Sequence, residues 1–294
     1  MKPPLPLPDY GRFAGLRRRV GTAVNYLLLV LIALTTVLPF VWMVFTSLHP
    51  ETAEAPTPAT LFRPASWHPG NYTYVLFFPE LPIWRFTLNS FIVTGGVVLL
   101  QLTLCSLAAF AFSRLHWRGR DAVFFLFIIT MMIPGQVLVV PLFLIVERLG
   151  WINTYWGLII PAQYLSTAFG TFLLRQFFIT IPPALDEAAR LDGCGELGVL
   201  WHVILPASKP ALATVAAFAF IWTWTDFYWA LIATHSRDMR TLEVGLSIFN
   251  VSYSGTQYPL RMTAAVIVLV PVLAVFLLLQ RYFVRGVTMS GVKG

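Results

Sequence analysis

The chain has 294 residues, of which 57% are hydrophobic and only 11% are charged, and its mean hydropathy is +0.74. This composition excludes an ordinary soluble domain and indicates a polytopic membrane protein. The formal net charge of +7 is explained better by basic loops beside anionic lipid than by nucleic-acid binding. The two cysteines, Cys105 and Cys194, fall at different predicted depths, so no disulfide is expected.

Six apolar stretches are long enough to cross a hydrocarbon core of about 30 Å, which needs roughly 20 residues per helix. The first is also longer than the apolar region of a signal peptide, about 7–15 residues, so an uncleaved helix is expected. The predicted fold class is an all-α membrane protein with six transmembrane helices. The stretches are Tyr26–Ser47, Leu88–Phe112, Ala122–Val146, Tyr155–Phe178, Ala211–Ala233 and Thr263–Val284.

Six spans place both termini on one side of the membrane. That side would hold 14 of the 20 Lys and Arg residues, and the bias of basic residues toward the cytoplasm therefore puts both termini inside. The expected organisation is a cytoplasmic segment 1–25, a six-helix membrane domain 26–284 and a cytoplasmic tail 285–294. The external segment 48–86 suits a functional role, either as a cap on the pore mouth or as a contact for an external partner. An interfacial segment whose aromatic side chains lie among the lipid headgroups explains it equally well. In the second external loop, a short helix is expected over Thr241–Phe249.

Polar side chains inside the spans are candidates for a solute pathway. Asp226 is the only acidic residue within a predicted span, and an ionisable group at that depth is a functional candidate. A hydrated position near the outer interface explains it equally well. Four further pathway candidates could line the same route, although hydrogen bonds between helices account for them equally well. They are Gln136, Gln163, Ser166 and Thr167.

Residues 179–210 separate the fourth and fifth stretches and are too polar to span the bilayer. Two prolines open a short helix that has Asp186 and Glu187 in its first turn, where the helix dipole favours acids. Gly193 ends this helix, and a second short helix follows. The pattern predicts a cytoplasmic helix–turn–helix with two weakly apolar faces, which suit either a groove on a partner or the membrane surface. Those faces carry Leu185, Ala188 and Leu191, and then Leu197, Leu200, Trp201 and Ile204.

The spacing of Glu187-Ala188-Ala189, Gly193 and Leu205-Pro206 resembles the EAA motif of binding-protein-dependent ABC importers. Shorter stretches, including Asn89-Ser90 and Leu149–Trp156, resemble the maltose-type, carbohydrate-uptake class of permease. In that family the EAA segment is a coupling loop that receives the motion of a cytoplasmic ATPase. The resemblance implies that ATPase coupling involves Glu187, Ala188, Ala189, Asp192, Gly193, Leu197, Leu200, Trp201, Leu205 and Pro206.

The resemblance also implies a complex of two homologous permeases, a cytoplasmic ABC ATPase dimer and an external solute-binding protein. This complex would lie in a bacterial or archaeal plasma (inner) membrane. The implied solutes are sugars or related polyols and glycerol phosphates. The chain would form half of the translocation pore.

The sequence contains no motif for nucleotide binding or catalysis. A Walker A loop requires Gly-Lys-Ser/Thr, whereas the lysines here follow Met1, Ser208 and Val292. No metal-ligand spacing, nucleophile elbow or cofactor motif is found, so no enzymatic activity, catalytic residue, metal or cofactor is expected. The alternative is a self-contained secondary carrier or channel for small polar solutes. Such carriers usually place ionisable groups at mid-membrane and often show inverted repeats.

Overall fold

The computed structural model of the chain describes residues 10–50, 57, 67–252 and 257–289. Every regular element among these residues is helical, which confirms the predicted all-α class. The chain divides into two units, residues 1–71 with 255–266 and residues 72–254 with 267–294. The segments expected at 1–25, 48–86 and 285–294 lie partly outside the described residues, and their boundaries remain predictions.

In the first unit, hydrogen bonds gather around the end of α1 (Tyr10–Ser47). Asn71 donates through Nδ2 to the carbonyls of Ser47 and His49, at 2.8 and 2.6 Å. Thr263, near the start of α15 (Tyr258–Met289), donates to the Ser47 carbonyl at 3.0 Å. The last turn of α1 leaves carbonyls without helical partners, and these side chains satisfy that of Ser47 and the carbonyl of His49 just beyond the helix.

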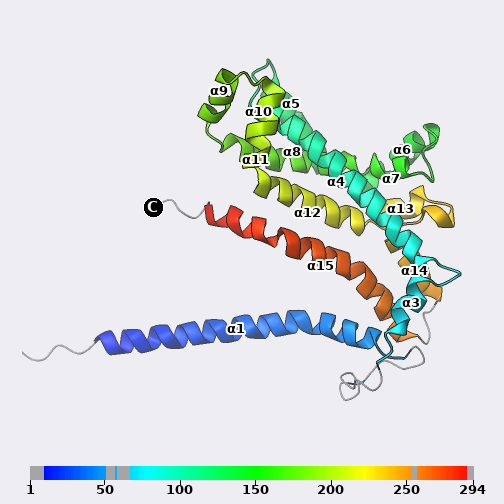
Figure 1. Ribbon diagram of the computed structural model, residues 1–294. Coiled ribbons are helices and arrows are strands. Elements are labelled where there is room, and N and C mark those ends of the chain that lie inside the picture. Colours follow the sequence, from blue (N-terminus) through cyan, green and yellow to red (C-terminus); the bar gives the residue numbers. More distant parts are fainter. Residues whose placement is uncertain (1–9, 51–56, 58–66, 253–256, 290–294) are drawn as a thin grey trace, which may run out of the picture. The chain divides into compact units, whose positions relative to one another are not determined.

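The second unit is built on α4 (Ile83–Ser113), which packs against α8 (Gln163–Ile179) and α12 (Lys209–Trp224) (Figure 1). The approach of α4 to α8 is close, because a Cβ added at Gly170 would lie 2.6 Å from the sulfur of Cys105. Small residues at helix interfaces permit such contact in membrane proteins. Gln101 adds a 2.9 Å hydrogen bond from Nε2 to the carbonyl of Ser166.

The predicted span Ala122–Val146 is not one continuous helix. It consists of α5 (Arg120–Ile129) with η2 (Thr130–Met132), followed after a bend of 100° by α6 (Gly135–Arg148). Pro134 stands at the bend. A proline has no N–H for the helix and disfavours the helical conformation of the residue before it, and Ile133 is indeed extended, with φ −81° and ψ 115°.

Two other predicted spans are also interrupted. The stretch Tyr155–Phe178 is divided into α7 (Tyr155–Ile159) and α8. The stretch Ala211–Ala233 is divided into α12 and α13 (Tyr228–Ala233). The breaks fall at Pro161 and around Asp226. Hydropathy alone does not predict these turns, because the residues on both sides of each break are apolar.

Three helical stretches within the described residues are individually long and apolar enough to cross a membrane: Gly21–Ser47, Ile83–Ser113 and Tyr258–Tyr282. Three bent helix pairs would raise the number of spans to six if each pair counts as one. One pair is α5 and η2 with α6, and each of the other two joins α8 or α12 to a short helix of residues 179–210. The six-span topology therefore stays a prediction.

At one end of α4, residues 234–242 form a loop held by side chains from elsewhere in the chain. Asn153 has a φ of 60°, and its Oδ1 accepts hydrogen bonds from the backbone of His235 and from the backbone and hydroxyl of Ser236, at 2.9–3.0 Å. The loop contains η4 (Arg237–Met239) and leads into α14 (Leu242–Ser252). The helix expected over Thr241–Phe249 is thus present as α14.

Candidate functional site

Residues 179–210, here called the EAA segment, begin with the short helix α9 (Pro183–Leu191). Proline is well suited to the first helical position, where its missing N–H is not needed. The helix ends in a turn whose Gly193 has a φ of 91°, a conformation that glycine adopts without steric strain. The N–H groups of Gly193 and Cys194 donate to the carbonyls of Arg190 and Ala189, at 3.0 and 2.9 Å, and so close the turn.

The second half of the EAA segment comprises α10 (Glu196–Val199), the π-helical turn η3 (Leu200–Ile204) and α11 (Leu205–Ala207). Such π-turns occur often at functional sites. Arg190 joins the two halves through hydrogen bonds of 3.1 and 3.0 Å to both carboxylate oxygens of Glu196. These hydrogen bonds raise the pKa of Arg190 above its ordinary value.

One side of the EAA segment is packed into the core of the second unit. Ala189, Leu200 and Ile204 share a buried cluster with Phe110 of α4 and Phe178 of α8. The sequence analysis offered a partner groove or the membrane surface for the second apolar face, but this part of the face packs within the chain itself. Leu200 and Ile204 are 4% and 0% exposed.

The other side of the EAA segment is exposed and apolar. Leu191, Leu197 and Trp201 are 90%, 70% and 69% exposed. Three large apolar side chains exposed on one short segment favour an interaction surface. Among the expected coupling residues, Ala189 and Leu200 are buried and Leu205 is half-buried. The exposed ones are Glu187, Ala188, Asp192, Gly193, Leu197, Trp201 and Pro206.

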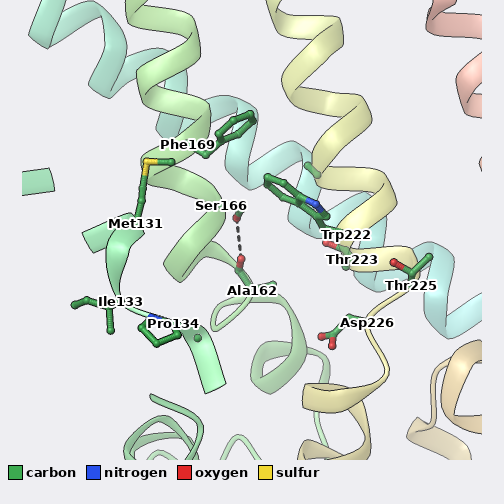
Figure 2. Close-up of a pocket in the computed structure, with 12 residues that line it drawn as sticks. Met131, Ile133, Pro134, Ala162, Ser166, Phe169, Trp222, Thr223, Thr225 and Asp226 are labelled. Atoms are coloured by element: carbon green, nitrogen blue, oxygen red, sulfur yellow. Dashed lines mark hydrogen bonds between the residues drawn. The ribbon is translucent and has the colours of Figure 1, made fainter. Parts of the chain in front are cut away.

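A second candidate site is a cavity of about 720 Å³ bordered by α8, α12 and the turn before α6 (Figure 2). Its volume falls in the range of small-molecule sites, about 300–1,000 Å³. The lining combines aromatic and aliphatic surface with a few hydroxyls and one carboxylate. It comprises Met131, Ile133, Pro134, Gly135, Ala162, Ser166, Phe169, Ala219, Trp222, Thr223, Thr225 and Asp226.

Aromatic rings form one wall of this cavity. Phe169 and Trp222 have ring centroids 5.3 Å apart and are inclined at 64°. Phe218 packs behind them, with centroids 5.3 and 5.4 Å from the other two rings. The indole of Trp222 is 45% exposed, so part of its ring surface is free to contact a solute.

Asp226 follows the end of α12 and lies on the same side of the cavity as Trp222 and Thr223, across from Ile133 and Pro134, as Figure 2 shows. Its Oδ1 accepts a 3.2 Å hydrogen bond from the N–H of Trp229, which caps the first turn of α13. Capping by an aspartate is a structural role, but the lining position leaves the carboxylate next to the empty volume. Asp226 therefore both lines the cavity and satisfies a backbone N–H of α13, and the pathway and interface roles considered from the sequence stay predictions.

The structure brings only two of the five pathway candidates to the cavity, Asp226 and Ser166. Gln163 is buried and donates to the carbonyls of Val97 and Ile159, at 3.3 and 3.4 Å, so it joins helices instead. Gln136 is exposed and Thr167 is half-buried, and neither lines the cavity.

Sequence reasoning missed two features of these sites. Trp222 and Thr223 line the cavity beside Asp226, and the run of alternating Trp and Thr before the acid was the available signal. Arg114 forms a buried ion pair with Asp186 of the EAA segment, with Nε 2.9 Å from Oδ2. Because the two residues are 72 positions apart in the sequence, no local sequence pattern indicates that contact.

Residues 101–289 match the family described as binding-protein-dependent transport system inner membrane component. The chain is 33% identical over 284 residues to the arabinooligosaccharides transport system permease protein AraQ of Halalkalibacterium halodurans, covering 95% of this chain and 100% of the relative. It is 33% identical to the trehalose/maltose transport system permease protein MalG of Thermococcus litoralis, covering 90% and 94%.

A third relative is the sn-glycerol-3-phosphate transport system permease protein UgpE of Yersinia enterocolitica, 35% identical over 71% of this chain and 74% of the relative. Among solved structures, a bacterial ABC transporter involved in the import of the acidic polysaccharide alginate has a similar chain. That chain matches with a TM-score of 0.75 and 26% identity, over 96% of this chain and 100% of its own length. The protein therefore belongs to the binding-protein-dependent transport system inner membrane components, and it is a permease subunit of an ABC importer rather than an enzyme.

Proposed function

We propose that the chain forms half of the translocation pore of an ATP-driven carbohydrate importer and receives the motion of the ATPase through the EAA segment. The observation that carries the coupling role is the division of this segment into two sides. Ile204 is 0% exposed in the core, whereas Trp201, three positions earlier, is 69% exposed. A short segment anchored on one side and apolar on the other suits a groove on a partner protein.

The proposed partners are a second homologous permease, a cytoplasmic ABC ATPase dimer and an external solute-binding protein. Membership of a binding-protein-dependent family supports the last of these. We place the chain in the inner membrane with six spans and both termini in the cytoplasm. The distribution of basic residues supports this orientation, which puts the EAA segment on the ATPase side and the 234–242 loop outside.

The proposed mechanism is alternating access. ATP binding would close the ATPase dimer and move the docked EAA segment, and α8 and α12, which flank it in sequence, would follow. A ligand shifts a conformational equilibrium only by its differential affinity for the two states. The exposed face around Leu191, Leu197 and Trp201 would therefore have to bind the ATPase differently in the inward-facing and outward-facing states.

The proposed solutes are polyhydroxylated molecules, namely sugars or related polyols and glycerol phosphates. The relatives named above are described as transporters of arabinooligosaccharides, of trehalose and maltose, and of sn-glycerol-3-phosphate. The cavity supports the same class, because the Trp222 ring offers an apolar surface beside Asp226, Thr223 and Ser166. These polar groups are able to accept hydrogen bonds from solute hydroxyls.

Coupling is tested with Gly193→Asp and with a cysteine at position 187 for crosslinking to the ATPase. The substitution forces a side chain into the left-handed turn, so crosslinking and ATP-driven uptake should both fall while membrane insertion is retained. Gly95→Ala is the control, because a Cβ there has no neighbour within 4 Å. Normal crosslinking and normal uptake by Gly193→Asp would overturn the coupling role.

The solute class is tested with the solute-binding protein encoded beside the chain. Its affinity for maltose, an arabinotriose and sn-glycerol-3-phosphate is measured by calorimetry, and uptake of the best ligand is measured in proteoliposomes that hold the whole complex. Uptake should require ATP and all subunits. Transport by the isolated chain, driven by a proton or solute gradient, would favour the secondary-carrier alternative.

A further inference from the structure

The end of α4 is joined to the EAA segment by a buried ion pair and a hydrogen bond. Arg114 directly follows the last residue of α4, and its Nε lies 2.9 Å from Oδ2 of Asp186 in the first turn of α9. Its Nη2 donates a 2.8 Å hydrogen bond to the carbonyl of Ile181. The two charged side chains are 8% and 4% exposed.

Asp186 depends on Arg114 for the compensation of its charge. Its other carboxylate oxygen, Oδ1, is buried and has no hydrogen-bond partner among the residues that the structure describes. Removing one member of a buried pair leaves an uncompensated charge, which is far more unfavourable than removing both.

The ion pair also differs in kind from the apolar contacts around it. Ala189 of the EAA segment and Phe110 of α4 share the same buried cluster, and apolar contacts of this type have no preferred direction. A guanidinium, by contrast, presents its donors in a rigid planar fork. Arg114 therefore links the start of α9 to the end of α4 through one directional hydrogen bond, from Nη2 to the Ile181 carbonyl, and one charge contact, from Nε to Asp186.

The opposite end of α4 is held to the 234–242 loop. Arg85 forms an ion pair of 3.3 Å with Asp238, and Ser90 accepts a 2.9 Å hydrogen bond from the N–H of Leu242. The helix has 31 residues, which corresponds to about 46 Å at 1.5 Å per residue. As Figure 1 shows, α4 runs from the end where α9 and α10 lie to the end where α13 and α14 lie.

We propose that Arg114 and Asp186 are positioning residues that make α4 the helix through which displacement of the EAA segment reaches the 234–242 loop. The covalent chain connects the EAA segment directly only to α8 and α12. The ion pair adds a polar connection to α4, whose far end contacts the loop directly through Arg85 and Ser90. The route through α12 reaches the same loop only by way of the turn at Asp226 and α13. This inference rests on the proposed coupling of the EAA segment to an ATPase.

The EAA segment contains a matched control for this pair. Arg190 and Glu196 lie 3.0 Å apart, with side chains 40% and 48% exposed, and both belong to the EAA segment itself. Neutralising Arg190 removes an ion pair of the same chemistry without touching α4. Exposed pairs of this kind contribute little to stability.

The experiment compares wild type, Arg190→Gln and the double variant Arg114→Gln/Asp186→Asn, each assembled with its co-encoded partners in lipid nanodiscs. The double variant removes both charges and so leaves no unpaired buried charge. Hydrogen exchange of residues 234–242 is measured with and without a non-hydrolysable ATP analogue. We expect the analogue to change the exchange rate of these residues at least threefold in wild type and in Arg190→Gln. In the double variant, the change should be less than half of the wild-type change.

A wild-type response in the double variant would overturn the proposal. If the double variant does not assemble, Arg114→Lys takes its place, because lysine keeps the charge without the fork. A reduced response in Arg114→Lys supports the proposal, and a full response overturns it.

A cysteine at position 187, in a Cys194→Ala background, separates this inference from the proposed function. The remaining Cys105 is 0% exposed. Absence of crosslinking to the ATPase in this otherwise wild-type protein contradicts the coupling role itself. Crosslinking without any response of the 234–242 loop contradicts the inference alone.

Discussion

The hydroxyl of Tyr155 donates a 2.7 Å hydrogen bond to Oδ1 of Asn89. The amide nitrogen of Asn89 donates in turn to the carbonyls of Asp238 and Arg240, at 2.8 and 2.9 Å. Asn89 is only 2% exposed. One side-chain amide therefore joins α4, α7 and the 234–242 loop.

Replacing Asn89 by alanine should loosen this loop. The substitution leaves two carbonyls and the Tyr155 hydroxyl without their partner, and each buried unsatisfied group costs about 1–3 kcal/mol. Tyr155→Phe removes one neutral hydrogen bond, worth about 0.5–1.5 kcal/mol, and should have the smaller effect. Thermal unfolding of the detergent-purified protein and hydrogen exchange of residues 234–242 measure both. Equal protection of the loop in wild type and Asn89→Ala would contradict the assigned role.

These contacts assign a structural role to two stretches that the sequence analysis used only for their resemblance to the permease class. Asn89-Ser90 holds the loop from α4, and Asn153, in the stretch Leu149–Trp156, holds it through Oδ1. The partners stand 82 to 152 positions apart. Hydropathy and helical periodicity report neighbours a few residues away, so they do not reveal such pairs.

The positions of prolines likewise do not predict by themselves where a helix is interrupted. Pro39, Pro141 and Pro271 all lie inside helices, whereas Pro134 stands at the 100° bend between η2 and α6. Every one of these prolines lacks a donor, but neighbouring groups in a membrane protein are able to satisfy the freed carbonyls. The turn at Gly193 was accessible from the sequence, because it depends on one residue and its immediate neighbours.

Gly245→Ala should destabilise the protein, because α14 approaches α4 closely at this position. A Cβ at 245 would overlap the ring of Phe86, which is 0% exposed. Overpacking of this kind costs about 1–3 kcal/mol. Gly95→Ala is the control within α4, since a Cβ there meets nothing within 4 Å; it should stabilise by about 0.5–1 kcal/mol through helix propensity. Thermal midpoints that shift in the same direction for both variants would contradict this geometry.

Trp201→Ala and Ile204→Ala should separate partner binding from folding. Ile204 is 0% exposed, and its truncation should cost about 2–5 kcal/mol of stability. Trp201 is 69% exposed, so its truncation should leave the melting temperature of the isolated chain nearly unchanged but weaken association with the ATPase. Affinity of the purified permease for the ATPase, measured beside thermal stability, distinguishes the two. A large loss of stability in Trp201→Ala would show that the ring packs within the chain.

Asp226→Asn and Asp226→Ala should separate the two roles of this residue. Asparagine keeps an acceptor for the N–H of Trp229, now 3.2 Å from Oδ1, and removes the charge. Alanine removes both, and the loss of a helix cap costs about 0.5–2 kcal/mol. We expect Asp226→Asn to unfold like wild type while its ATP-driven uptake falls several-fold, because the carboxylate lines the cavity beside Trp222 and Thr223. Asp226→Ala should lose both stability and uptake. Thermal unfolding and uptake at saturating ATP are measured for both variants. Wild-type uptake by Asp226→Asn would assign the carboxylate to capping alone and leave solute contact to the aromatic wall and hydroxyls of the cavity.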